Sequence, residues 1–71
     1  MKYAIGTKYL PHEKHPRICA VTDFLTVTNS KGEIVRTYYQ STCEFMGQTI
    51  TNHEVCAATI ARGIPRLEAM Q

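Results

Sequence analysis

The sequence has no tryptophan, no glycine-rich loop and no long apolar run. Its 71 residues include four scattered glycines, so no phosphate-cradling glycine motif is present. No stretch approaches the ~20 apolar residues that span a membrane, and the first residues lack the apolar segment of a secretory signal peptide. The formal net charge is only +2, which indicates a nucleic-acid binder only where the cations gather on one face. These absences predict a soluble protein of the cytoplasm.

Cysteine is scarce, and its spacing does not suggest a disulfide framework. The chain has three cysteines, Cys19, Cys43 and Cys56, so they cannot all pair with one another, and none lies in a Cys-x-x-Cys motif. This favours a reduced, cytoplasmic setting. With 44% hydrophobic and 20% charged residues, the chain is expected to fold as one small domain over residues 1–64, followed by a C-terminal tail at 65–71. So small a core only narrowly offsets conformational entropy, and a homo-oligomer would bury further apolar surface.

The most informative segment is 19–46, where two alternating stretches flank the turn residues Asn29-Ser30-Lys31-Gly32. This pattern predicts a long antiparallel hairpin with arms at Ile18–Thr28 and Glu33–Met46. Asp23 interrupts the apolar row and is therefore expected near the sheet rim, at a bulge or against a hydrogen-bond donor. The residues predicted to face the core are Cys19, Val21, Leu25, Val27, Val35, Tyr39, Cys43 and Phe45.

Weaker strand signals flank this hairpin. Tyr3 to Leu10 alternates like a half-buried strand with a bend or bulge at Gly6. Pro11 to Arg17 is polar and is expected to be an exposed loop. The long second arm is expected to bend near Gln40 to Thr42. A tight turn at Gly47-Gln48 and a short extended segment at Thr49-Ile50 are expected to follow it.

The apolar period becomes helical near the C-terminus. Thr51-Asn52-His53-Glu54 matches a capping box, which predicts a helix over Asn52–Ala61. Gly63 predicts the helix stop, and Pro65 is expected to prevent continuation. The order of elements favours a mainly β fold: a small SH3-like or related curled β-sheet or barrel with a long central hairpin and one short C-terminal helix. A four-stranded sheet with one helix packed across it is the alternative.

Histidine and cysteine cluster in two places, at His12-x-x-His15 followed by Cys19, and at His53-x-x-Cys56. Zinc favours nitrogen and sulfur ligands, but neither cluster has a regular zinc-finger spacing, and cysteines in a predicted core act as small hydrophobes. No metal or other cofactor is therefore predicted. Cys56 and His53 would approach each other at i and i+3 on a helix. No orienting acid or oxyanion donor accompanies them, so the chain is predicted to be a non-enzyme.

The candidate partner-binding residues are mostly cationic. They are Lys14, His15 and Arg17 in the first loop, and Lys31, Arg36 and Tyr38 on the hairpin. Small barrels bind nucleic-acid strands by combining a basic groove with stacking aromatic side chains. The interleaved acidic residues Glu13, Glu33 and Glu44 instead favour an ordinary solvated surface. Tyr38 is predicted to lie on the face opposite Tyr39, so it is the aromatic residue expected to be exposed as a contact anchor.

Three short runs, YAIGTKY at 3–9, EFMGQ at 44–48 and TIARG at 59–63, resemble those of small accessory proteins of tailed bacteriophages and prophages. The similarity extends over nearly the whole chain and includes no catalytic motif. It implies a protein that acts without catalysis, by plugging, masking or sequestering a host component, as anti-CRISPR and other anti-defence inhibitors do.

These features together predict a small non-enzymatic binding protein that blocks or sequesters a host protein, complex or signalling molecule in the host cytoplasm. A nucleic-acid-binding regulator that uses the same basic and aromatic surface is the alternative. A structural or assembly subunit, recognisable by a stable closed oligomer, is a further alternative.

Overall fold

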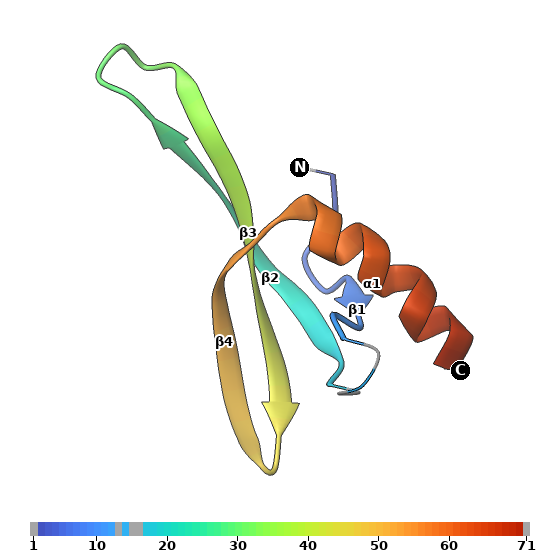
Figure 1. Ribbon diagram of the computed structural model, residues 1–71. Helices are drawn as coiled ribbons and strands as arrows, with labels where there is room; N and C mark the ends of the chain where they lie inside the picture. Colours follow the sequence, from blue (N-terminus) through green and yellow to red (C-terminus); the bar gives the residue numbers. More distant parts are fainter. Residues whose placement is uncertain (1, 13, 15–16, 71) are drawn as a thin grey trace.

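The computed structural model describes residues 2–12, 14 and 17–70, and Figure 1 shows their arrangement as four antiparallel strands followed by a helix. The elements are β1 (Lys8–Tyr9), β2 (Cys19–Thr28), β3 (Ile34–Phe45), β4 (Gln48–Val55) and α1 (Ala57–Met70). The strands form one sheet in the order β1-β2-β3-β4, with each strand antiparallel to the next. The expectation of a mainly β fold is confirmed.

The sheet is open, so the expectation of an SH3-like barrel is wrong. A barrel closes when its first and last strands pair, whereas β1 and β4 are the two edges of this sheet. With two residues, β1 offers too short an edge for the eight-residue β4. The chain instead leaves β4 as a helix that packs against β1, and α1 lies beside β1 in Figure 1. The four-stranded sheet with one helix, the alternative architecture, describes the molecule.

Most of the expected first strand is a turn. Gly6 has a φ of +94°, a left-handed conformation that glycine adopts without steric cost. Thr7 closes this turn by donating to the carbonyl of Ala4 from both its backbone nitrogen, at 3.1 Å, and its hydroxyl, at 2.7 Å. The bend expected at Gly6 is confirmed, but the strand is limited to Lys8–Tyr9.

The long hairpin is confirmed, and its turn has the predicted chemistry. The side-chain oxygen of Asn29 accepts from the backbone nitrogens of Lys31 and Glu33, at 2.9 and 3.1 Å. Gly32 has a φ of +82° and donates its backbone N–H to the Asn29 carbonyl at 3.0 Å. Asn29 therefore fixes the register of the hairpin locally, as an asparagine at the first turn position does. The second turn is at Met46-Gly47, one residue earlier than expected; both residues have positive φ, and Phe45 pairs with Gln48.

Two register shifts flank Gln40. On one side, Val21 pairs with Ser41 but Asp23 pairs with Gln40, which leaves Thr22 as an extra residue of β2. On the other side, β4 carries an extra residue between its pairs with Ser41 and Tyr39. The bend predicted for β3 is therefore near the right place, but the bulged strands are its two neighbours. Asp23 lies at the β2 bulge, one of its three expected places, and its carboxylate accepts from the Phe24 backbone N–H at 2.8 Å.

The β2 bulge corrects the predicted inward face. Because one extra residue reverses the alternation, Phe24 pairs with Tyr39 on the core side, and their ring centroids are 4.8 Å apart. Leu25 and Val27 consequently lie on the opposite face, so their predicted burial in the core is wrong. The predicted burial of Val35 is also wrong: 60% of its surface is exposed, because that part of β3 extends beyond the body that the helix covers.

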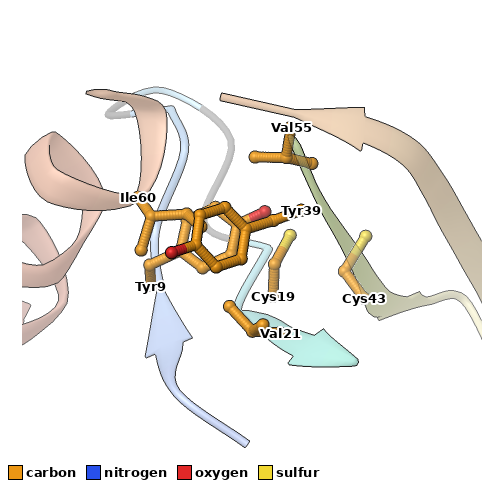
Figure 2. Close-up of a cluster of buried hydrophobic side chains, with 7 residues drawn as sticks. All are labelled: Tyr9, Cys19, Val21, Tyr39, Cys43, Val55 and Ile60. Carbon is orange, nitrogen blue, oxygen red and sulfur yellow. The ribbon is translucent and has the colours of Figure 1, made fainter. Parts of the chain in front are cut away.

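The remaining inward residues form a small core beneath α1. Figure 2 shows Tyr9, Cys19, Val21, Tyr39, Cys43, Val55 and Ile60 gathered from all four strands and the helix. Cys19 and Cys43 are buried as predicted, whereas Phe45 at the end of β3 is 40% exposed. Burial of such side chains contributes about 1.5–3 kcal/mol each for the larger ones. The core therefore depends on every element, including the two-residue β1.

The capping box does not start the helix. Residues 51–55 belong to β4, where Thr51 pairs with Thr42 and Val55 with Tyr39, so sheet pairing satisfies the backbone there instead. Helix α1 begins at Ala57 and continues through Gly63 and Pro65, both of which were expected to end it.

Packing on β1 explains why the helix continues past Gly63. The buried residues of α1 are Ile60, Gly63 and Leu67, and the Gly63 carbonyl accepts from the Leu10 backbone N–H at 2.9 Å. Beyond Pro65, Leu67 is buried and Arg66 donates to the Pro11 carbonyl at 2.7 Å. These contacts offset the ~3 kcal/mol that an interior proline costs a helix. Residues 65–70, predicted to be a tail, form the last turns of α1.

The close contact at Gly63 predicts that a larger residue there lowers the free energy of unfolding. A Cβ at this position would lie 2.8 Å from Cδ2 of Tyr9 and 3.0 Å from backbone atoms of Leu10. Gly63→Ala is expected to lower the free energy of unfolding by about 1–3 kcal/mol through overpacking, although helix propensity alone would raise it by about 1 kcal/mol. Urea unfolding followed by circular dichroism measures the change. Exposed Ala61→Gly serves as the propensity control, and a more stable Gly63→Ala variant would contradict the close approach.

Candidate binding surfaces

The most exposed part of the molecule is the β2–β3 arm, defined as residues 25–38. The last β3–β4 pair is Tyr39 with Val55, so beyond it the arm has only its own two strands. Figure 1 shows the arm projecting away from α1, and the molecule measures 45 × 25 × 19 Å. Two-stranded hairpins are marginally stable alone. The body of the sheet and the Asn29 turn hold the arm in register at its two ends.

One face of this arm carries an apolar stripe that we call the outer arm face, formed by Leu25, Val27, Arg36 and Tyr38. Leu25 pairs with Tyr38, and Val27 pairs with Arg36. The Arg36 guanidinium lies 4.9 Å from the Tyr38 ring centroid and forms a 2.5 Å ion pair with Glu54 of β4. Because both partners of that pair are half exposed, it contributes little stability. Its effect is to hold Arg36 across the tyrosine ring and to neutralise its charge.

The other face of the arm is polar at the same level. Thr26 and Thr37 form the pair between the two rungs of the outer arm face, and both are exposed. At this level, strand alternation thus separates the outer arm face from a pair of threonines. Toward the tip, the next pair joins Thr28 to the exposed Ile34 after a further register shift. Lys31 lies at the tip, in the Asn29–Gly32 turn.

The predicted binding residues that the structure describes lie in two separate groups. Lys31, Arg36 and Tyr38 are on the arm, whereas Arg17 lies two residues before the start of β2, at its other end. Tyr38 pairs with Leu25, which is six residues along β2 from Cys19, so about 20 Å of strand at ~3.3 Å per residue separates the start of β2 from Tyr38. Lys14 is exposed in the loop before Arg17, and His15 lies outside the described residues. The structure therefore does not bring the five described residues together into one surface.

Arg17 lies against a pocket that sequence reasoning did not detect. Its guanidinium carbon is 3.7 Å from the Phe45 ring centroid, and its Nε is buried without a hydrogen-bond partner among the described residues. The adjoining pocket has a volume of about 380 Å³ and is lined by side chains from β1, β4 and α1 as well as from the loop.

The wall of this pocket includes a buried polar network. The Tyr9 hydroxyl and the Ser41 hydroxyl are 2.6 Å apart, and the Asn52 amide donates to Ser41 Oγ at 3.2 Å. The same amide lies 3.8 Å from the sulfur of Cys19. Burial raises the pKa of the Tyr9 phenol and raises that of the Cys19 thiol to about 11, so both groups are neutral at physiological pH.

Cys56 has a different environment from the one predicted. It is exposed immediately before α1 rather than on an apolar helix face, and its sulfur lies 3.1 Å from the Thr59 hydroxyl. This hydrogen bond is the main cause that lowers the pKa of the Cys56 thiol. His53 is in β4 and not on the helix, so the i, i+3 approach of His53 to Cys56 expected from the sequence does not apply. Within the described part of the chain, no group of three or more metal-ligating side chains is placed to hold a metal ion.

Sequence reasoning missed the partners that complete each surface. Leu25 and Val27 were expected in the core, and the signal for their outward position is Asp23, which marks the bulge. Phe45 contacts Arg17 from the end of β3, and Asn52 lines the pocket from within β4. Both are distant from Arg17 in sequence, so no local signal indicates these contacts.

Comparison of the chain with protein-family models, curated proteins and solved structures finds no match. In the described residues, no helix is long and apolar enough to cross a membrane.

The Cys56 environment predicts selective alkylation. Because a lowered pKa gives more thiolate at a given pH, iodoacetamide should modify Cys56 with a pH midpoint below that of an ordinary thiol. Cys19 should stay unmodified in the folded protein. Thr59→Val removes the hydroxyl and should move the Cys56 midpoint upward. Mass spectrometry after timed alkylation across pH measures both, and equal midpoints in the two proteins would contradict the assigned cause.

The buried network predicts a stability loss. Ser41→Ala removes the partner of both the Tyr9 hydroxyl and the Asn52 amide, and should cost about 1–3 kcal/mol of the free energy of unfolding. Tyr9→Phe in the same background should cost less than it does in the wild type, because the hydroxyl has already lost its partner. Urea unfolding of the double-mutant cycle measures the coupling, and strictly additive losses would contradict it.

Proposed function

We propose that this chain is a small non-enzymatic binding protein that blocks a host protein by docking the outer arm face of its β2–β3 arm onto it. The observation that carries the proposal is the β2 bulge, which moves Leu25 and Val27 beside Tyr38 on an arm that projects from the body. A half-exposed apolar stripe with one tyrosine and one arginine has the composition of interface centres. The phage resemblance of the sequence supports a host component as the partner.

A protein partner is favoured over nucleic acid by the charges on this face. Arg36 is its one cation among Leu25, Val27, Arg36 and Tyr38, and Glu54 already pairs with it. Backbone recognition of DNA or RNA depends on several cations that contact phosphates. The outer arm face is mostly apolar, and the charge of its arginine is neutralised by Glu54. Such a face suits a protein partner, because water is excluded from the centre of a protein interface.

The test compares two variants that differ only in the face that they alter. Val27→Glu places a charge on the outer arm face, and Thr26→Glu places the same charge on the neighbouring residue, which faces the other way. Tagged wild type and both variants are incubated with host-cell lysate, and captured proteins are quantified by mass spectrometry. The captured protein is then purified, and its dissociation constants are measured. Val27→Glu should weaken binding at least tenfold, while Thr26→Glu should retain it.

Further measurements distinguish the competing functions. Capture should survive nuclease treatment and change little between 50 and 300 mM salt, because a steep salt dependence is the mark of phosphate contacts. Light scattering of the purified chain tests self-association. A partner lost equally in both variants, binding that nuclease abolishes, or a dimer that Val27→Glu alone dissociates would each overturn the proposal.

A further inference from the structure

The pocket beside Arg17 has the size and the lining of a small-molecule site. Its volume of about 380 Å³ is within the range of pockets that hold small ligands. It lies at the end of the sheet opposite the β2–β3 arm, so docking of a protein on the outer arm face leaves it open. Elements distant in sequence converge on it: Tyr9 from β1, Asn52 from β4 and Thr59 from α1.

Arg17 supplies a positive charge to the described lining of this pocket, and contact with a ring holds it in place. The Arg17 guanidinium stacks on the Phe45 ring, which fixes the plane of its donor fork, and its buried Nε lacks a partner among the described residues. His12 also lines the pocket, and the described lining residues include no carboxylate. A planar arginine fork matches the oxygens of a phosphate or carboxylate. The site therefore selects an anion.

The rest of the lining is suited to an organic body attached to that anion. Pro11 and Ile50 provide apolar walls, while Asn52 and Thr59 provide hydrogen-bonding groups. Asn52 is held by its bonds to Ser41 and Cys19, so its amide keeps a fixed position at the pocket. This combination of apolar walls and a few fixed polar groups is typical of small-molecule sites.

We propose that this pocket binds a small organic phosphate of about nucleotide size, with the phosphate at Arg17 and the organic body between Pro11 and Ile50. The inference is independent of the arm: it gives the chain a second site, for a small molecule, at the other end of the sheet.

Adenosine 5′-monophosphate is the probe, with adenosine and inorganic phosphate as its two separated halves. Calorimetry measures affinity, and amide chemical shifts in ¹⁵N-labelled protein map the site. The monophosphate should bind at least tenfold more tightly than either half, with shifts at Asn52 and Thr59 rather than on the β2–β3 arm. Adenosine 5′-carboxylate separates carboxylate from phosphate recognition and should bind more weakly than the monophosphate.

Variants of Arg17 and Ile50 test the assignment. Arg17→Gln removes the charge and should weaken monophosphate binding at least tenfold, whereas Arg17→Lys keeps the charge and should weaken it less. Ile50→Phe fills the pocket and should abolish binding in a folded protein, as checked by circular dichroism. Thr26→Glu on the arm is the negative control and should bind normally, because Thr26 lies far from the pocket and outside the outer arm face. No binding at millimolar monophosphate, inorganic phosphate binding as tightly, or affinity unchanged in Arg17→Gln would overturn the proposal.

Discussion

The register of β3 against its two neighbours at Gln40 is the constraint on which the rest of the structure depends. β2 and β4 each carry one extra residue beside this position. On the body side of Gln40, Val21 and Ser41 face the core. On the arm side, Phe24 takes the inward place and Leu25 the outward one. One inserted residue in β2 therefore decides both which side chains stabilise the core and which are presented to a partner.

The body itself is held by a close contact between α1 and the short β1. Tyr9 is almost fully buried, and its ring leaves no room for a side chain at Gly63. The same tyrosine reaches across the core to Ser41 through its hydroxyl. Tyr9 therefore connects the helix, the first strand and the polar wall of the pocket. The two-residue β1 thus supplies a large share of the stabilising contacts through this one side chain. In a chain of 71 residues, such shared contacts replace a larger core.

Local signals in the sequence predicted the hairpin and its turn, because the alternation and the Asn29–Gly32 chemistry act within a few residues. The mainly β fold follows from them. The faces of the arm could not be predicted by extending the alternation through Asp23, since a bulge reverses it. The predicted helix boundaries were wrong because tertiary contacts override local signals. At the start, Thr51 to Glu54 matches a capping box, but these residues pair with β3 instead. At the end, burial of Leu67 outweighs the free-energy penalty of Pro65 inside the helix. The candidate binding residues predicted from the sequence include Arg17, Arg36 and Tyr38. Their structural neighbours Phe45, Val27 and Leu25 were not predicted as such, because pairing between strands brings them there.

The two-stranded construction of the β2–β3 arm also limits how its reach can vary. Each rung adds ~3.3 Å to the distance between tip and body. Removing a single rung between Gln40 and the outer arm face would turn that face to the threonine side, so the reach can change only in steps of two rungs, about 6.6 Å, if the same side chains are to point outward. A relative of this chain that presented the same side chains at a different distance from the body would therefore have two rungs more or fewer between Gln40 and the outer arm face.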